Sequence, residues 1–170
     1  MKNEVELTYM MTSIDTLNAC KSIKGWEVTA TFSVGGFEWL AFSKERHGKM
    51  IIISSQRTTI VDCNNGAIDD CEIILDEKEL IAYCDRLPDE ELSIAGQFGG
   101  SLPQKTDNGE KVTVKVDDKH IMHIYFTAGF LNKTLIYYNY EAYICGFSYD
   151  GTYFVIADDG GVLILKKTKD

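Results

Sequence analysis

The chain has 170 residues, of which 45% are hydrophobic and 25% charged, and its formal net charge is −9. This length allows one domain with a core of useful size. The acidic surplus argues against nucleic-acid binding, which needs basic groups to displace phosphate counterions. No apolar run approaches the roughly 20 residues that cross a bilayer. Acids also stand where a signal peptide would have its apolar centre, so we expect one globular domain over residues 1–170, in the cytoplasm.

In the first half of the chain, residue patterns predict one short helix among several strands. Alternation over residues 4–10 indicates a first strand. Ser13 suits the N-cap of a helix over about 13–22, which Gly25 would end. Strands are then expected near 26–33, 37–43, 49–55 and 58–63.

Residues 69–91 hold most of the net charge. Ten acids against Lys78 and Arg86 give this segment −8, which leaves −1 for the other 147 residues. Such a surface repels nucleic acid and can steer a basic partner. The simpler interpretation is an acidic helix with its solvated flanks.

The pattern after residue 75 predicts that second helix, over about 76–86. Asp76 suits the N-cap, and Glu79 three residues later completes a pair like a capping box. Pro88 disfavours helix in the residue before it. The apolar stripe of this helix would consist of Leu80, Ile81 and Cys84.

The second half reads as strands after one long irregular stretch. Residues 96–109 are rich in glycine and lack a period, and a loop of that length is uncommon in a compact domain. Strict alternation over 110–116 and a matching run over 119–126 predict a hairpin. Further strands are expected over 134–140 and in the last twenty residues.

Two segments, 41–61 and 146–164, resemble each other as units of β-hairpins. Phe42-Ser43 aligns with Phe147-Ser148, and Met50–Ile53 aligns with Tyr153–Ile156. The copies share apolar strand patterns but not polar turn residues, so we interpret the repeat as scaffold. The predicted fold class is α+β, predominantly antiparallel β, with meander-rich sheets and two short helices.

The sequence offers no catalytic or metal-binding constellation. There is no G-x-S-x-G elbow, and the glycine loop lacks the G-K-[ST] of a phosphate loop. His120 and His123, three apart on a strand, point to opposite faces. The five cysteines form no C-x-x-C pair, so we expect reduced structural thiols, no metal and no cofactor. They are Cys20, Cys63, Cys71, Cys84 and Cys145.

These features favour a non-enzymatic intracellular protein that binds another protein. A small acidic chain of this kind suits an immunity- or antitoxin-type inhibitor that occludes a basic effector. The residues expected to bind the partner are the acids Asp76, Glu77, Glu79, Asp89, Glu90 and Glu91.

Two alternatives remain open on the sequence. A small-molecule-binding or enzymatic β-domain would use the 96–109 loop as a lid, with Trp39, Tyr125 and Tyr138 around a pocket. A structural or multimerising module would pair edge strands such as 4–10 or 161–166 between chains. Oligomeric state and partner identity are not set by the sequence. The loop residues expected at a ligand are Phe98, Gly99, Gly100 and Leu102.

Overall fold

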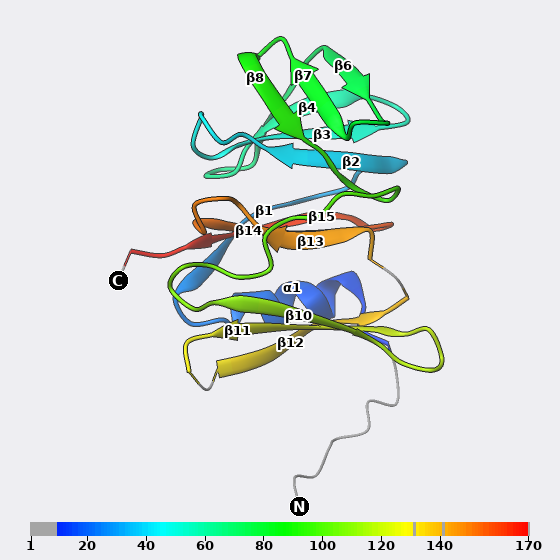
Figure 1. Ribbon diagram of the computed structural model, residues 1–170. Helices are drawn as coiled ribbons and strands as arrows, with labels where there is room; N and C mark the ends of the chain where they lie inside the picture. Colours follow the sequence, from blue (N-terminus) through cyan, green and yellow to red (C-terminus); the bar gives the residue numbers. More distant parts are fainter. Residues whose placement is uncertain (1–9, 131, 141, 170) are drawn as a thin grey trace, which may run out of the picture.

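The structure is a computed structural model that describes residues 10–130, 132–140 and 142–169. Within these residues the fold is predominantly antiparallel β, with one α-helix and four small sheets stacked as layers (Figure 1). The predicted dominance of antiparallel strands is confirmed. The strand predicted over residues 4–10 lies, apart from Met10, outside the described residues.

Two inner sheets form the middle of the stack. Sheet A has the order β1-β15-β14-β13 and sheet B the order β5-β4-β3-β2-β9. The strands of sheet A are β1 (Trp26–Phe32), β13 (Ile144–Phe147), β14 (Tyr153–Asp158) and β15 (Gly161–Lys167). Those of sheet B are β2 (Phe37–Phe42), β3 (Lys49–Ser54), β4 (Thr58–Asp62), β5 (Ala67–Asp70) and β9 (Ala95–Gly96).

Two outer layers cover the faces of these sheets that point away from each other (Figure 1). Sheet C lies on sheet B, whereas sheet D and helix α1 lie on sheet A. The strands of sheet C are β6 (Ile73–Asp76), β7 (Ile81–Cys84) and β8 (Leu87–Ser93). Those of sheet D are β10 (Lys111–Val116), β11 (Met122–Ala128) and β12 (Asn132–Asn139), beside α1 (Ser13–Lys21).

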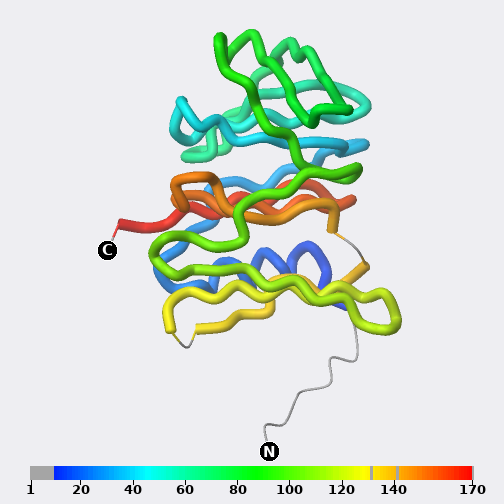
Figure 2. Tube along the Cα trace, viewed as in Figure 1, coloured from blue at the N-terminus to red at the C-terminus, as the bar shows by residue number. Residues whose placement is uncertain are grey.

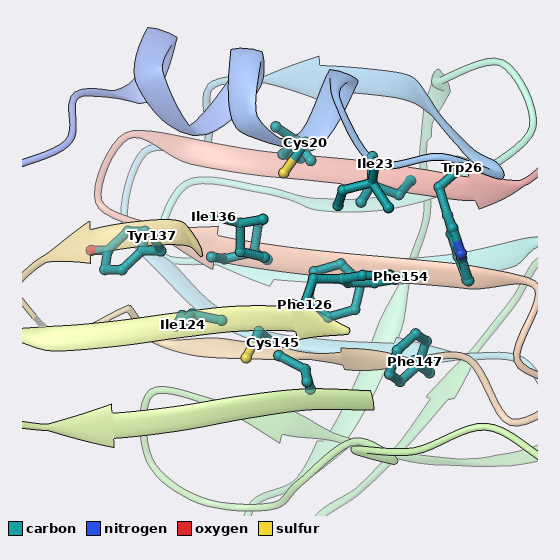
Figure 3. Close-up of a cluster of buried hydrophobic side chains, with 14 of the residues drawn as sticks. Cys20, Ile23, Trp26, Ile124, Phe126, Ile136, Tyr137, Cys145, Phe147 and Phe154 are labelled. Atoms are coloured by element: carbon teal, nitrogen blue, oxygen red, sulfur yellow. The ribbon is translucent and has the colours of Figure 1, made fainter. Parts of the chain in front are cut away.

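Burial on both faces explains the continuous apolar runs of the inner strands. In β14, Tyr153 and Val155 pack toward sheet B, while Phe154 and Ile156 pack toward sheet D and α1. A strand between two layers has no solvent face, so polar residues do not alternate along it. Figure 3 shows the core between sheet A, sheet D and α1, where Phe154 lies edge-to-face with Phe126 at 5.2 Å between centroids.

The helix begins at Ser13, within the predicted range, but its N-cap is Thr12 rather than Ser13. The Thr12 hydroxyl accepts the N–H of Asp15 at 3.2 Å, and the Asp15 carboxylate accepts the N–H of Thr12 at 2.8 Å. This reciprocal pair satisfies donors that the first helical turn leaves free. Cys20 then reaches the core between the helix and sheet A (Figure 3).

The predicted helix over 76–86 is wrong. Strand β6 ends at Asp76, a turn follows, and β7 pairs with it so that Leu75 faces Ala82. Ala82 and Cys84 alternate inward onto Trp39 and other residues of sheet B. The outer face of sheet B needs an apolar cover. Residues 81–84 therefore form a strand, whose inward side chains repeat every two residues, although their local spacing fits a helix.

The glycine-rich stretch is a strap between layers. The chain leaves sheet B at β9, passes the edge strand β13 of sheet A, and enters sheet D at β10 (Figure 2). The Phe147 N–H donates to the Pro103 carbonyl at 2.8 Å, and the Gln104 amide donates to the Cys145 carbonyl at 2.9 Å. These bonds cover an edge that would otherwise offer free backbone groups.

The two segments of the proposed repeat occupy adjacent sheets. The first spans β2, β3 and β4 of sheet B, and the second spans β13, β14 and β15 of sheet A. Both are antiparallel meanders, but their common origin as a repeat stays a prediction. Strand β15 lies between β1 and β14, so the expectation that 161–166 forms a free edge is wrong.

Candidate partner-binding surface

Sheet C forms one end of the stack (Figure 1), and its outer face carries exposed apolar side chains. Ile73 and Leu75 pack inward, so Ile74 between them points outward and is 73% exposed. Ile74 pairs in register with Tyr83, which is 42% exposed. Directly opposed residues on one face of a sheet lie side by side. The two side chains therefore form one small apolar patch.

Exposed acids share sheet C and its turns with this patch. The Tyr83 hydroxyl donates to the Glu91 carboxylate at 2.9 Å, and this bond raises the pKa of Tyr83. The turn between β6 and β7 is closed by the N–H of Glu79 donating to Asp76 at 3.0 Å. All of the predicted partner-binding acids except Glu90 are exposed: Asp76, Glu77, Glu79, Asp89 and Glu91.

Glu90 does not belong to the exposed set. Its side chain is only 5% exposed and turns toward the turn between β2 and β3. Its carboxylate accepts the Ser43 hydroxyl at 2.6 Å and the Lys44 N–H at 2.9 Å, and Arg46 lies 3.6 Å away. The pairing of β7 with β8 is irregular here, which lets β8 turn this side chain inward. Glu90 is a structural residue.

The predicted ligand-loop residues serve the packing of the strap. Phe98 is 66% exposed and lies against Trp39, with 5.8 Å between ring centroids. Gly100 has φ +74°, and a Cβ there would stand 2.3 Å from the Ile94 carbonyl oxygen. Leu102 is 2% exposed and belongs to the core between sheets A and B. Gly99, at φ +143°, completes the turn before that close approach.

A cavity of about 260 Å³ does lie beside the strap, between the edge of sheet A and sheet D. It is lined mainly by apolar side chains, among them Leu102, Ile124 and Ile144. The aromatic residues expected around it are elsewhere. Trp39 is buried between sheets B and C, and Tyr138 packs against His123 in sheet D.

Two of the three histidines, His47 and His123, pair with carboxylates. His47 pairs through Nδ1 with Asp150, and His123 pairs through Nε2 with Asp117 at 3.0 Å. The bond to His123 lowers the pKa of Asp117. His120 is exposed in a turn at φ +64°. None of these pairs has a serine or cysteine nucleophile bonded to its imidazole in the part of the chain described here.

The cysteines are all free and buried. Burial raises the pKa of Cys20, Cys63 and Cys145 to about 12, which keeps these thiols protonated at neutral pH. A protonated thiol is a poor nucleophile. These three residues therefore act as small hydrophobic side chains.

Sequence reasoning missed the patch of Ile74 and Tyr83. Tyr83 lay within the predicted helix and Ile74 just before it, whereas the structure places both on the solvent face of a hairpin. The acids around them were found because charge is read directly from the sequence.

Comparison with known proteins gives no match: no family model fits the sequence, no curated protein resembles it, and no solved structure resembles the fold. Among the described residues, no helix has the length and apolar character needed to cross a bilayer.

Proposed function

We propose that this chain is a non-enzymatic binding protein whose outer face of sheet C occludes a basic protein partner. The observation that supports this most directly is an exposed apolar pair, Ile74 and Tyr83, on a sheet that also carries exposed acids at one end of the fold. Aromatic anchors supply much of the affinity of protein interfaces. Surrounding charges increase the rate of encounter and select the sign of the partner.

An immunity- or antitoxin-type inhibitor is the role that fits this surface best. Segment 69–91 has a net charge of −8, so the long-range field at this end attracts a positively charged effector such as a nuclease. The five free thiols suit a reduced compartment, in keeping with a cytoplasmic location.

The experiment compares two variants with the same change of net charge. One reverses Glu77, Glu79 and Glu91 to Lys, leaving the buried Glu90 intact. The other reverses Glu27, Asp107 and Asp118, three exposed acids outside sheet C. Immobilised wild-type and variant proteins are incubated with extracts of the source cells, and retained proteins are identified by mass spectrometry.

We expect a basic protein that the wild type and the control variant retain and that the sheet C variant loses. Its affinity should fall as salt rises, and Tyr83→Ala should weaken it about tenfold or more. If both reversal variants lose the basic protein equally, the binding depends on net charge and not on sheet C. Retention of the partner by the sheet C variant would disprove the role of this face.

The cavity beside the strap supports a second candidate function, the binding of a small apolar ligand. Its volume of about 260 Å³ is close to the lower end of ligand pockets, and Gln104 offers a polar group at its wall. Val114→Trp, at an exposed position of the cavity wall, should abolish any thermal shift caused by an apolar ligand. A library of such ligands that leaves the wild-type melting temperature unchanged would rule this candidate out.

The two hairpin segments have a structural role in this proposal. We infer that segments 41–61 and 146–164 are two copies of one meander that form the scaffold, and that binding residues lie outside them. Their equivalent positions Ile52 and Val155 both face the core between sheets A and B. Swapping the polar turns of the two segments should leave partner binding unchanged.

A further inference from the structure

Two buried cysteines and one carboxylate converge at the junction of sheets B and C. Cys71 and Cys84 are 9% and 4% exposed, and Asp85 is exposed at the rim. One ligand atom of each, the two sulfurs and a carboxylate oxygen, lie within 4.8 Å of one another. The two cysteines stand thirteen residues apart in sequence, so no spacing motif reveals the cluster.

Hydrogen bonds with the backbone anchor this cluster at two points, Cys71 and Asp85. Cys71 is anchored to β4, because its N–H donates to the Thr58 carbonyl at 3.1 Å and the Thr58 hydroxyl donates to its carbonyl at 2.5 Å. Asp85 and Glu72 exchange two bonds: the Asp85 N–H donates to the Glu72 carbonyl at 3.1 Å, and the Glu72 N–H donates to Asp85 Oδ1 at 2.9 Å. Outer contacts of this kind hold ligands in a fixed orientation.

We propose that Cys71, Cys84 and Asp85 form a binding site for a thiophilic divalent ion of the Zn²⁺ class. Two thiolates and a carboxylate are ligands that zinc accepts in tetrahedral sites. At zinc–sulfur bonds of about 2.3 Å, the sulfurs of such a site stand roughly 3.8 Å apart. The two sulfurs therefore need to approach by about 1 Å or less from their upper bound of 4.8 Å.

Charge and protons also balance at this site. On binding, each cysteine thiol releases its proton to solvent, so two protons leave for each ion bound. The resulting complex of two thiolates, one carboxylate and a divalent cation carries one negative charge. Burial raises the pKa of Cys71 to about 12, which opposes this release, but the ion itself supplies the positive charge that stabilises the thiolates. The fourth coordination position, on the solvent side beside Asp85, goes to water.

The test uses fully reduced full-length protein, freed of metal with a chelator and titrated with Co²⁺. Cobalt bound to thiolates absorbs by charge transfer in the near ultraviolet, and its intensity counts the thiolates on each ion. We expect one cobalt per chain with two thiolates, displaced by Zn²⁺. Zn²⁺ should also raise the melting temperature of the reduced protein, reversibly on chelation.

The other cysteines provide matched controls. Cys71→Ser and Cys84→Ser should each weaken cobalt binding at least about tenfold and halve the thiolate absorption, whereas Cys63→Ser and Cys145→Ser should leave both unchanged. Asp85→Asn should weaken binding while both thiolates remain. The wild-type spectrum tests the site even if a variant does not fold. Absence of thiolate absorption in the wild type, or equal effects of Cys63→Ser and Cys71→Ser, would overturn the proposal.

Discussion

A substitution at Glu90 tests whether this acid stabilises the fold, in contrast to the exposed acids of sheet C that we assign to partner binding. The structure predicts that Glu90→Ala destabilises the fold, although Glu90 lies among acids that serve the surface. Its carboxylate accepts bonds from the Ser43 hydroxyl and the Lys44 N–H, and it is the only carboxylate paired with Arg46 among the described residues. Nη1 of Arg46 is buried and makes no hydrogen bond, so the Glu90 carboxylate at 3.6 Å is the group that balances its charge among the described residues.

The size of the effect follows from these contacts. A hydrogen bond to a charged group contributes about 1.5 to 3 kcal/mol, and water that enters the vacated site recovers part of the loss. We therefore expect Glu90→Ala to cost about 3 kcal/mol. For a chain of this size that lowers the melting temperature by about 6 to 12 °C. Glu90→Gln, which keeps the shape and one acceptor oxygen, should cost about half as much.

Urea unfolding followed by circular dichroism measures this cost, provided that the denaturant slope stays unchanged. Glu91→Ala is the matched control, because Glu91 is adjacent and exposed, and within the described residues its carboxylate bonds only to the Tyr83 hydroxyl. It should change stability by less than about 0.5 kcal/mol. If Glu90→Ala is as harmless as Glu91→Ala, the network around Glu90 does not support the fold and our reasoning is refuted.

Three further substitutions test the packing of the inner sheet and its links to the outer layer, all by urea unfolding. Gly146→Ala would place a methyl carbon 2.5 Å from Leu102 Cβ, so we expect a loss of about 2 kcal/mol; an unchanged midpoint would mean that the strap yields freely. Phe154→Ala empties a fully buried site and should cost about 3 to 5 kcal/mol, and a loss below about 1 kcal/mol would contradict its central place. Burial acts to raise the pKa of Glu110, but hydrogen bonds led by Lys167 outweigh it, so its folded pKa lies below the ordinary 4.5. The stability it contributes is thus present above pH 4.5 and lost as pH falls through the folded value, and Glu110→Gln should flatten this dependence; an equally steep acid limb in the variant would argue against it.

The strap gives a structural reason for the glycines from which the sequence predicted a ligand loop. Residues 96–109 lack a period because they cross between layers instead of joining neighbouring strands of one sheet. Glycine is needed where the strap passes close to other backbone, because a Cβ on Gly100 would collide with the Ile94 carbonyl oxygen. Gly146 in the facing edge strand is matched to the strap in the same way. A loop that passes a sheet edge needs small residues whether or not it binds a ligand.

The sequence by itself determined the dominance of strands, the short helix near residues 13–21 and the acidic segment. Apolar runs such as Met50–Ile53 predict strands wherever they end up, since their β-branched residues suit an extended backbone. Only the tertiary structure decided the fate of residues 76–86, whose local pattern fits a helix. The outer face of sheet B, with Trp39, required an apolar cover, and a hairpin supplied it. The same packing turned Glu90 inward, exposed Tyr83 and brought the cluster around Cys84 together, because these outcomes depend on contacts between residues distant in sequence.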